Sequence, residues 1–259
     1  MRNVLSISEK FKELKTRNEA ALILYVTGGY PNLADSMKIL KTLSENGADI
    51  IEIGIPFSDP IADGPTIQDS SHTSLMKGTT LKRIMGNLKK LELETPIVFM
   101  SYLNPLLAYG KEEVLRDMNK NGVSGLIIPD LPVEEASEWI SLSKDYKIEL
   151  IFLVTPTSPA KRRKKIIQET RGFVYCVSVT GTTGVRSKMP SYLNKFLKDI
   201  RKSTETPIAI GFGISTSKQI ETLRDKVDGV IIGSRIIEAI KNEENIKELA
   251  SEFKEATKR

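Results

Sequence analysis

One carboxylic acid interrupts an apolar run that has the pattern of a buried strand. In the segment 50–55, IIEIGI, the side chains of a strand would alternate between two faces. If the isoleucines at 51, 53 and 55 pack outward against helices, Glu52 points toward the interior. Such a carboxyl is costly unless it is paired or protonated, and full burial raises its pKa by up to about 3–5 units. Glu52 is therefore a candidate general acid or base, with a structural ion pair to a buried Lys or Arg as the alternative.

A second carboxylate follows in the next loop. Residues 56–70, PFSDPIADGPTIQDS, contain Asp63 directly before Gly64 and Pro65, where an apolar helical stretch begins. By itself this position favours a helix N-cap. Because the loop follows the strand that carries Glu52, an acid–base pair formed by Glu52 and Asp63 is the second interpretation.

Glycine-rich segments predict a place for an anion. GFGIS (211–215) and IIGSR (231–235) each lead from an apolar run into a helical stretch, so backbone N–H groups at two helix starts could bind a phosphate. A third segment, TGTTGVRSK (180–188), has the composition of a mobile loop and is either a lid over the site or an ordinary surface loop.

The elements that would position these residues alternate along the whole chain. Short, nearly continuous apolar runs are typical of parallel strands covered on both faces, and amphipathic helical segments lie between them. The eight runs are 20–28, 48–57, 96–103, 123–130, 148–156, 173–181, 207–215 and 228–234. We expect an α/β fold: one closed (β/α)₈ TIM barrel over residues 1–259, with an extra N-terminal helix at about 3–17 across its bottom. A doubly wound open sheet is the alternative.

Helix boundaries can be predicted from single residues. Ser215 is expected to cap the helical segment that follows it. Gly47, Gly122 and Gly172 lie where the preceding helices should end. In a barrel of this class the chemistry occurs at the C-terminal ends of the strands, where the Glu52 strand, the Asp63 loop and both glycine segments would meet.

Several classes of function are disfavoured by residues that the sequence lacks. None of the eight runs contains the lysine that a Schiff-base or pyridoxal phosphate enzyme needs. The one histidine, His72, lies in a helical stretch, so we expect neither a metal site nor a Ser–His–Asp triad. Carboxylate acid–base chemistry without a cofactor, on a phosphorylated substrate, is the remaining prediction.

The bulk composition narrows the partners and the compartment. The net charge is +5, but the dense basic run 161–165, KRRKK, has no interleaved aromatic residues and fits a solvated helix face better than a nucleic-acid site. No apolar stretch has the length of a signal peptide or a membrane span, so no membrane partner is expected. The one cysteine, Cys176, lies in an apolar run and should be a buried structural thiol, which fits the cytoplasm.

With these motifs in place, the sequence resembles the tryptophan synthase alpha chain family. The segment IEIGIPFSDPIADGPTIQ (51–68) carries the most specific likeness, and YVTGGYP, MSYLNP, IIPDLP, YCVS, TTG, GFGIS and IGSR extend it along the chain. The resemblance implies that Glu52 is the general acid–base and Asp63 its partner near the indole nitrogen. It also implies pocket and phosphate-binding residues, which are Tyr25, Ile67, Tyr102, Ile127, Tyr175, Thr183, Gly184, Phe212, Gly213, Gly233 and Ser234.

The resemblance further implies a reaction and a partner. Members of this family cleave indole-3-glycerol phosphate to indole and glyceraldehyde 3-phosphate by a retro-aldol step, and Thr183 would orient the lid against Asp63. They dock on a pyridoxal-phosphate beta chain in an alpha2-beta2 assembly. We expect that contact at the loop 56–60 and at an apolar turn at 104–107, although both could be ordinary loops.

Two departures from the family pattern affect the lid and the pocket wall. The 181–184 loop reads GTTG where a Val usually precedes the Thr-Gly pair, and Tyr25 replaces a common Phe.

Three alternatives to this function remain: another phosphosugar barrel enzyme, an inactive barrel that only binds a beta chain, and a glycosidase with paired carboxylates. The lack of a strand lysine disfavours the other phosphosugar enzyme. The presence of both Glu52 and Asp63 disfavours the inactive barrel, and the phosphate-binding glycines disfavour the glycosidase.

Overall fold

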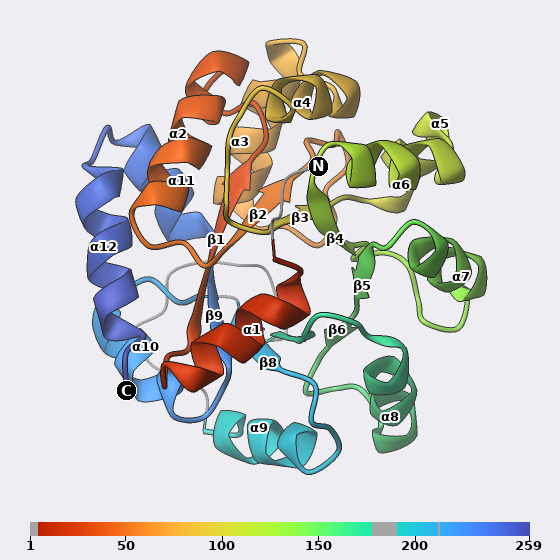
Figure 1. The fold of residues 1–259 in the computed structure, drawn as a ribbon, viewed down its shortest axis with the longest axis vertical. Helices are drawn as coiled ribbons and strands as arrows, with labels where there is room; N and C mark the ends of the chain where they lie inside the picture. Colours follow the sequence, from red (N-terminus) through yellow and green to blue (C-terminus); the bar gives the residue numbers. More distant parts are fainter. Residues whose placement is uncertain (1–4, 178–190, 212) are drawn as a thin grey trace.

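In the computed structural model, which describes residues 5–177, 191–211 and 213–259, parallel strands form a barrel at the centre and helices surround it (Figure 1). All eight predicted runs contain a strand. The fifth run is divided at Phe152, so the described residues contain nine strands. They are β1 (Ala21–Thr27), β2 (Ile50–Gly54), β3 (Ile97–Met100), β4 (Val123–Ile127), β5 (Glu149–Ile151), β6 (Leu153–Val154), β7 (Val174–Val177), β8 (Ile208–Gly211) and β9 (Gly229–Ile232).

The strand order closes the sheet on itself. It runs β5-β4-β3-β2-β1-β9-β8-β7-β6, and every pair is parallel. Because β5 and β6 belong to one sequence run, the first and last strands of this order meet at Phe152 and complete a ring. The (β/α)₈ prediction is confirmed, and the open doubly wound alternative is wrong.

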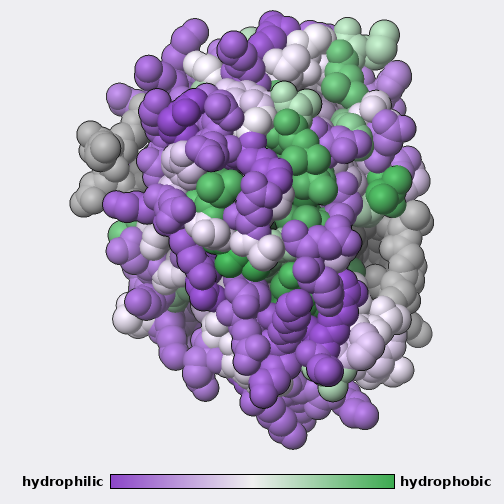
Figure 2. Space-filling model, turned by 90° about the vertical axis from the view of Figure 1, so that its right-hand side faces the viewer, coloured by the Kyte–Doolittle hydropathy of each residue, from purple (hydrophilic) through white to green (hydrophobic). Residues whose placement is uncertain are grey.

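Twelve helices lie within the described residues. Their bounds are α1 (Ile7–Thr16), α2 (Leu33–Glu45), α3 (Pro65–Met76), α4 (Leu81–Leu88), α5 (Leu103–Tyr109), α6 (Lys111–Lys120), α7 (Ser137–Asp145), α8 (Ala160–Glu169), α9 (Leu193–Arg201), α10 (Ser217–Arg224), α11 (Ser234–Lys241) and α12 (Ile246–Ala256). The side of the molecule on which α5 to α8 lie is mostly hydrophilic, with a narrower apolar strip (Figure 2). No helix in these ranges has both the length and the apolar character of a membrane-spanning segment.

Two apolar clusters lie on the two faces of the barrel wall. The outer cluster joins the strands to the surrounding helices and includes Ile51, Ile53 and Ile55. The inner cluster fills the barrel and includes Ile50. The alternation along β2 is therefore as predicted, and Glu52, which is buried, faces the interior together with Ile50.

The N-terminal helix covers the bottom of the barrel, as predicted. It begins at Ile7 rather than near residue 3, because the Ser6 side chain accepts the Glu9 N–H and Glu9 binds back to the Ser6 N–H. Ile7, Phe11 and Leu14 belong to the inner cluster, and α1 crosses the end of the barrel that faces the viewer in Figure 1. The Phe11 ring lies 5.7 Å from the Phe173 ring.

Local predictions had mixed outcomes. Gly47 and Gly122 directly follow the C-caps of α2 and α6 with positive φ, as predicted. Gly172 also has a positive φ, but α8 ends three residues earlier, at Glu169. Thr216, not Ser215, caps α10, because its side chain accepts the Gln219 N–H in a capping box. The segment 104–107 belongs to the helix α5 and is not a turn.

Candidate active site

Glu52 lies deep in the barrel, and none of the described residues forms an ion pair with it. It is 1% exposed, and its Oε2 has no hydrogen-bond partner among the described residues. Its neighbours in register are Tyr25 on β1 and Val98 on β3. No ion pair to Glu52 occurs within the described ranges, so the structural ion-pair alternative finds no support there. Burial, followed by the charge of Asp63, raises the pKa of Glu52 to about 8.

Asp63 faces the same interior from the loop after β2. Gly64 is the N-cap of α3 with no side-chain cap, and Pro65 occupies the first helical position, so the N-cap interpretation of Asp63 is wrong. The Asp63 carboxylate instead accepts a hydrogen bond from the Tyr102 hydroxyl at 2.9 Å. Burial raises the pKa of Asp63 to about 6, although the hydrogen bond from Tyr102 lowers it.

The loop that carries Asp63 is fixed from both ends. Ser71 of α3 accepts the Phe57 N–H at 2.9 Å and donates to the Phe57 carbonyl at 3.2 Å. Gln68 donates to the Asp63 carbonyl at 2.8 Å, and the Phe57 and Tyr102 rings lie 5.3 Å apart. A carboxylate held through its backbone, its side chain and the neighbouring ring is positioned before any ligand binds.

The predicted pocket residues lie together on the inner face. Tyr25, Ile67, Ile127 and Tyr175 all belong to the inner cluster, and Tyr102 joins them through Asp63. Burial raises the pKa of both Tyr25 and Tyr175 well above 10. The second cause is the charge of Asp63 for Tyr25 and the charge of Glu52 for Tyr175. Both phenols are therefore neutral at physiological pH, and this part of the inner face is apolar and aromatic with a few hydroxyls.

Glycines at two strand ends make room for these rings. A Cβ on Gly54 would collide with the Tyr25 hydroxyl, and a Cβ on Gly211 would lie 2.7 Å from the Tyr175 hydroxyl. Gly54 is the residue that follows Ile53 toward the loop of Asp63, so its small size has a packing reason that the sequence alone did not reveal.

The predicted anion site lies beyond Tyr25. Gly233 is the N-cap of α11 and has no side chain with which to cap it, and Ser234 is the first residue of this helix. Gly213, with φ +83°, follows β8, the strand next to β9 in the sheet. A Cβ on Gly233 would lie 3.4 Å from the Tyr25 ring, so the start of α11 adjoins Tyr25. Thr183, Gly184 and Phe212 lie outside the described residues.

Sequence reasoning missed the hydroxyl network behind Tyr25. Thr27 Oγ1 lies 3.4 Å from the Tyr25 hydroxyl and 2.6 Å from Ser70 Oγ, which donates to the Ile67 carbonyl at 2.8 Å. All of these side chains are buried. The period of two along β1 puts Thr27 on the inner face with Tyr25 and could have identified it. Ser70 could not be found this way because it lies on α3.

Three residues or segments without a role in the predicted site lie as expected. His72 is exposed on α3, and the basic run 161–165 lies on the outer side of α8 with most of its side chains exposed. Cys176 is buried, and burial raises the pKa of its thiol to about 12. No group of three or more His, Cys, Asp or Glu within the described ranges could hold a metal ion.

A closed parallel barrel with two buried carboxylates at the C-terminal end of its strands defines a (β/α)₈-barrel enzyme. The sequence model described as "Tryptophan synthase alpha chain" matches residues 11–259. The chain is 47% identical over 238 residues to the tryptophan synthase alpha chain of Carboxydothermus hydrogenoformans, covering 91% of this chain and 89% of that one. It is 44% identical over 250 residues to that of Prochlorococcus marinus, covering 95% and 89%.

Solved structures of tryptophan synthases also resemble this chain over nearly its whole length. A structure of Mycobacterium tuberculosis tryptophan synthase superimposes with a TM-score of 0.93 at 32% identity, covering 99% of this chain and all of that chain. A tryptophan synthase alpha chain from Legionella pneumophila superimposes with a TM-score of 0.87 at 29% identity, covering 97% and 96%. The chain therefore belongs to the tryptophan synthase alpha chain family, lyases that cleave indole-3-glycerol phosphate to indole and glyceraldehyde 3-phosphate.

Proposed function

We propose that Glu52 and Asp63 carry out the lyase reaction of this chain as an acid–base pair. The single observation that carries the proposal is the placement of two buried carboxyls, without a cation partner in the described residues, beside a cluster of buried aromatic and apolar side chains. A pKa of about 8 keeps Glu52 protonated at neutral pH, and a pKa of about 6 keeps Asp63 largely ionised. One environment thus supplies a proton donor and a negative charge at the same pH.

The proposed chemistry balances with these two groups. Protonated Glu52 gives its proton to C3 of the indole ring, while the Asp63 carboxylate accepts the hydrogen bond of the ring N–H and stabilises the positive charge that develops there. Glu52, now ionised, takes the proton of the glycerol hydroxyl next to the bond that breaks. The electrons of that C–C bond return to the ring, which releases indole and leaves an aldehyde. Each assisted proton transfer contributes roughly 10²–10⁴-fold to the rate.

Binding is assigned to the walls of the same pocket. We assign the indole ring to the space bounded by Tyr25, Ile67, Ile127 and Tyr175, which are buried apolar or aromatic side chains. We assign the phosphate to the backbone N–H groups at Gly213, Gly233 and Ser234, because an uncapped helix start attracts an anion. Thr183, Gly184 and Phe212 stay predicted members of these sites.

We further propose a beta chain as the macromolecular partner, in an alpha2-beta2 assembly. Support comes from the family and from exposed apolar side chains near the catalytic loop: Ile61 is 80% exposed and Leu107 is 43% exposed, while Phe57 is half-buried. The cytoplasm as compartment and residues 1–259 as one catalytic domain also stay predictions.

Indole release from indole-3-glycerol phosphate by the purified chain, with and without a beta chain, tests the function. We expect turnover that Glu52→Gln reduces by roughly 10²–10⁴-fold while substrate still binds. The rate should follow a bell-shaped pH profile, because Asp63 must be ionised and Glu52 protonated between pH values of about 6 and 8. An absence of turnover under both conditions would refute the lyase assignment and favour the inactive-scaffold alternative.

A further inference from the structure

The helix α5 has an unusual cap at its start. Its N-cap residue is Tyr102, whose side chain makes no capping hydrogen bond. The first N–H of the helix, at Leu103, instead donates to Asp130 Oδ1 at 2.9 Å. Asp130 lies in the loop that follows β4, 27 residues further along the chain. Helix starts leave N–H groups without partners in the helix, and here a carboxylate from another loop accepts one.

This remote cap leaves the Tyr102 side chain available for the active site. Tyr102 is 3% exposed, and its hydroxyl makes two hydrogen bonds of 2.9 Å. The Ala62 N–H donates to the hydroxyl oxygen, so the one hydroxyl proton is directed at the Asp63 carboxylate. Tyr102 therefore orients Asp63 and lowers its pKa relative to burial alone.

The bond from Asp130 acts on the backbone next to this tyrosine. Leu103 directly follows Tyr102, so its N–H belongs to the peptide group that joins the two residues. Fixing that peptide plane limits the directions in which the Tyr102 ring can project. The Phe57 ring, 5.3 Å away, limits the ring on another side.

We propose that Asp130 is a positioning residue of the lyase: its hydrogen bond to the Leu103 N–H holds Tyr102 in the orientation that fixes the Asp63 carboxylate beside Glu52. The inference rests on the proposed function of Asp63 and extends it to an exposed residue on a different loop. Asp130 touches neither of the reacting carboxyls, and it acts through the backbone of α5. The competing interpretation is that Asp130 merely stabilises the start of α5.

Three variants separate the hydrogen bond from the charge. In Asp130→Ala both are lost, and we expect kcat to fall about tenfold with a smaller change in KM, because small displacements of a catalytic group are costly. In Asp130→Asn the side-chain oxygen can still accept the N–H, and kcat should stay within about twofold of the wild type. Glu135→Ala removes another exposed charge from the same loop and serves as the control.

A double variant with Tyr102 tests whether Asp130 acts on Asp63 through the Tyr102 hydroxyl. If Asp130 acts through the phenol, then Asp130→Ala added to Tyr102→Phe should lower kcat by less than about twofold further. An equal tenfold loss in both backgrounds would overturn the proposal, as would an equal loss in the Ala and Asn variants.

A titration of the Asp63 carboxyl by carbon-13 NMR gives a readout that needs no turnover. Loss of the Tyr102 hydrogen bond should raise the pKa of Asp63 in Asp130→Ala by about half a unit. A mere helix cap would lower thermal stability and leave that pKa unchanged, and this result would refute the inference. Wild-type turnover that Glu52→Gln abolishes, together with an unchanged Asp63 titration in Asp130→Ala, would leave the proposed function standing and remove only the role of Asp130.

Discussion

Two buried carboxyls three residues apart show how differently the two ends of the barrel are built. Asp49, just before β2 at the bottom, is 8% exposed, and Glu52 within β2 is 1% exposed. Asp49 accepts the Leu22 N–H at 2.8 Å, and Lys254 approaches its two oxygens at 2.8 and 3.0 Å. Glu52 has an oxygen without a hydrogen-bond partner among the described residues. Asp49 and Glu52 are therefore buried to a similar extent but differ in their hydrogen-bond and ion-pair partners.

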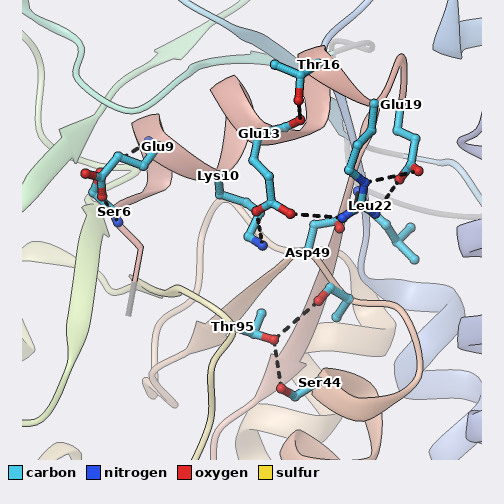
Figure 3. A network of polar contacts seen from close by, with 12 residues as sticks. Ser6, Glu9, Lys10, Glu13, Thr16, Glu19, Leu22, Ser44, Asp49 and Thr95 are labelled. Carbon is cyan, nitrogen blue, oxygen red and sulfur yellow. Dashed lines mark hydrogen bonds and ion pairs between the residues drawn. The ribbon is translucent and has the colours of Figure 1, made fainter. Parts of the chain in front are cut away.

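At the bottom, Asp49 belongs to an extended polar network. Lys254 of α12 also pairs with Glu19 at 2.7 Å, and Arg17 pairs with both Glu13 and Glu19. Figure 3 shows the α1 side of this network, with Lys10 and Glu13 beside Asp49 and Glu19. The network joins the last helix to the starts of β1 and β2.

The two carboxyls therefore differ in their partners and in the roles that we assign to them. A paired carboxylate at the bottom of a barrel stabilises the closed fold, whereas an unpaired one at the C-terminal end titrates near neutral pH and can exchange a proton. Burial also raises the pKa of Asp49, but the Lys254 charge and the Leu22 N–H offset part of this effect. Glu52 has no such offset, and the neighbouring Asp63 raises its pKa further.

The largest expected effect comes from breaking the bottom network. Lys254→Ala would leave the buried Asp49 and the partly buried Glu19 without this cation, and we expect the free energy of unfolding to fall by about 3–5 kcal/mol. Chemical denaturation measures this loss, and kcat of the folded enzyme should stay within about twofold. Lys258→Ala, which removes an exposed partner of Glu255, is the control and should cost at most about 1 kcal/mol. Equal losses in the two variants would contradict the structural role of the network.

At the C-terminal end of the barrel, Asp63→Asn should lower kcat and leave the fold stable, which is the opposite of the effect expected for Lys254→Ala. The amide can still receive the Tyr102 hydrogen bond but carries no charge to stabilise the indole nitrogen, so we expect kcat to fall about a hundredfold. Thermal stability should not fall, because burial raises the pKa of Asp63 and the costly carboxylate is replaced by a neutral group of the same shape. A large loss of stability with little loss of kcat would place Asp63 with Asp49 and not with Glu52.

The same comparison predicts how the stability of the fold depends on pH. The pKa of Glu52 rises from 4.5 to about 8 on folding, so the folded state binds the proton more tightly than the unfolded state does. The stability cost of Glu52 is therefore absent below a pH of about 4.5, grows between about 4.5 and 8, and is complete above that. Glu52→Gln should match the wild type at pH 4.5 and exceed it by a few kcal/mol at pH 9, as measured by denaturation at both pH values. A constant difference would show that Glu52 is not buried as an acid.

The sequence predicted the parts of this comparison that depend on short-range periodicity. The alternation along β2 placed Glu52 inside, and the eight apolar runs predicted the barrel. The interruption of the fifth strand at Phe152 was not predictable, because the apolar pattern continues through it. Ser215 and Thr216 are both good caps, and only the backbone geometry selects Thr216.

The side-chain partners were less predictable than the positions. Asp49 and Lys254 are 205 residues apart in sequence, and only the closed barrel brings them together. Asp63 has the sequence context of an N-cap, and the hydrogen bond from Tyr102 that gives it another role depends on the path of the loop. The role that we propose for Asp63 was implied by the family resemblance, not by its position in the sequence.

The direct test of the central claim is a carbon-13 NMR titration of the Glu52 carboxyl in the ligand-free chain, assigned by comparison with Glu52→Gln. We predict a midpoint near pH 8, which is the value expected for a buried carboxyl without a cation partner. A midpoint below a pH of about 5 would show that Glu52 is solvated or ion-paired and would contradict its role as the proton donor.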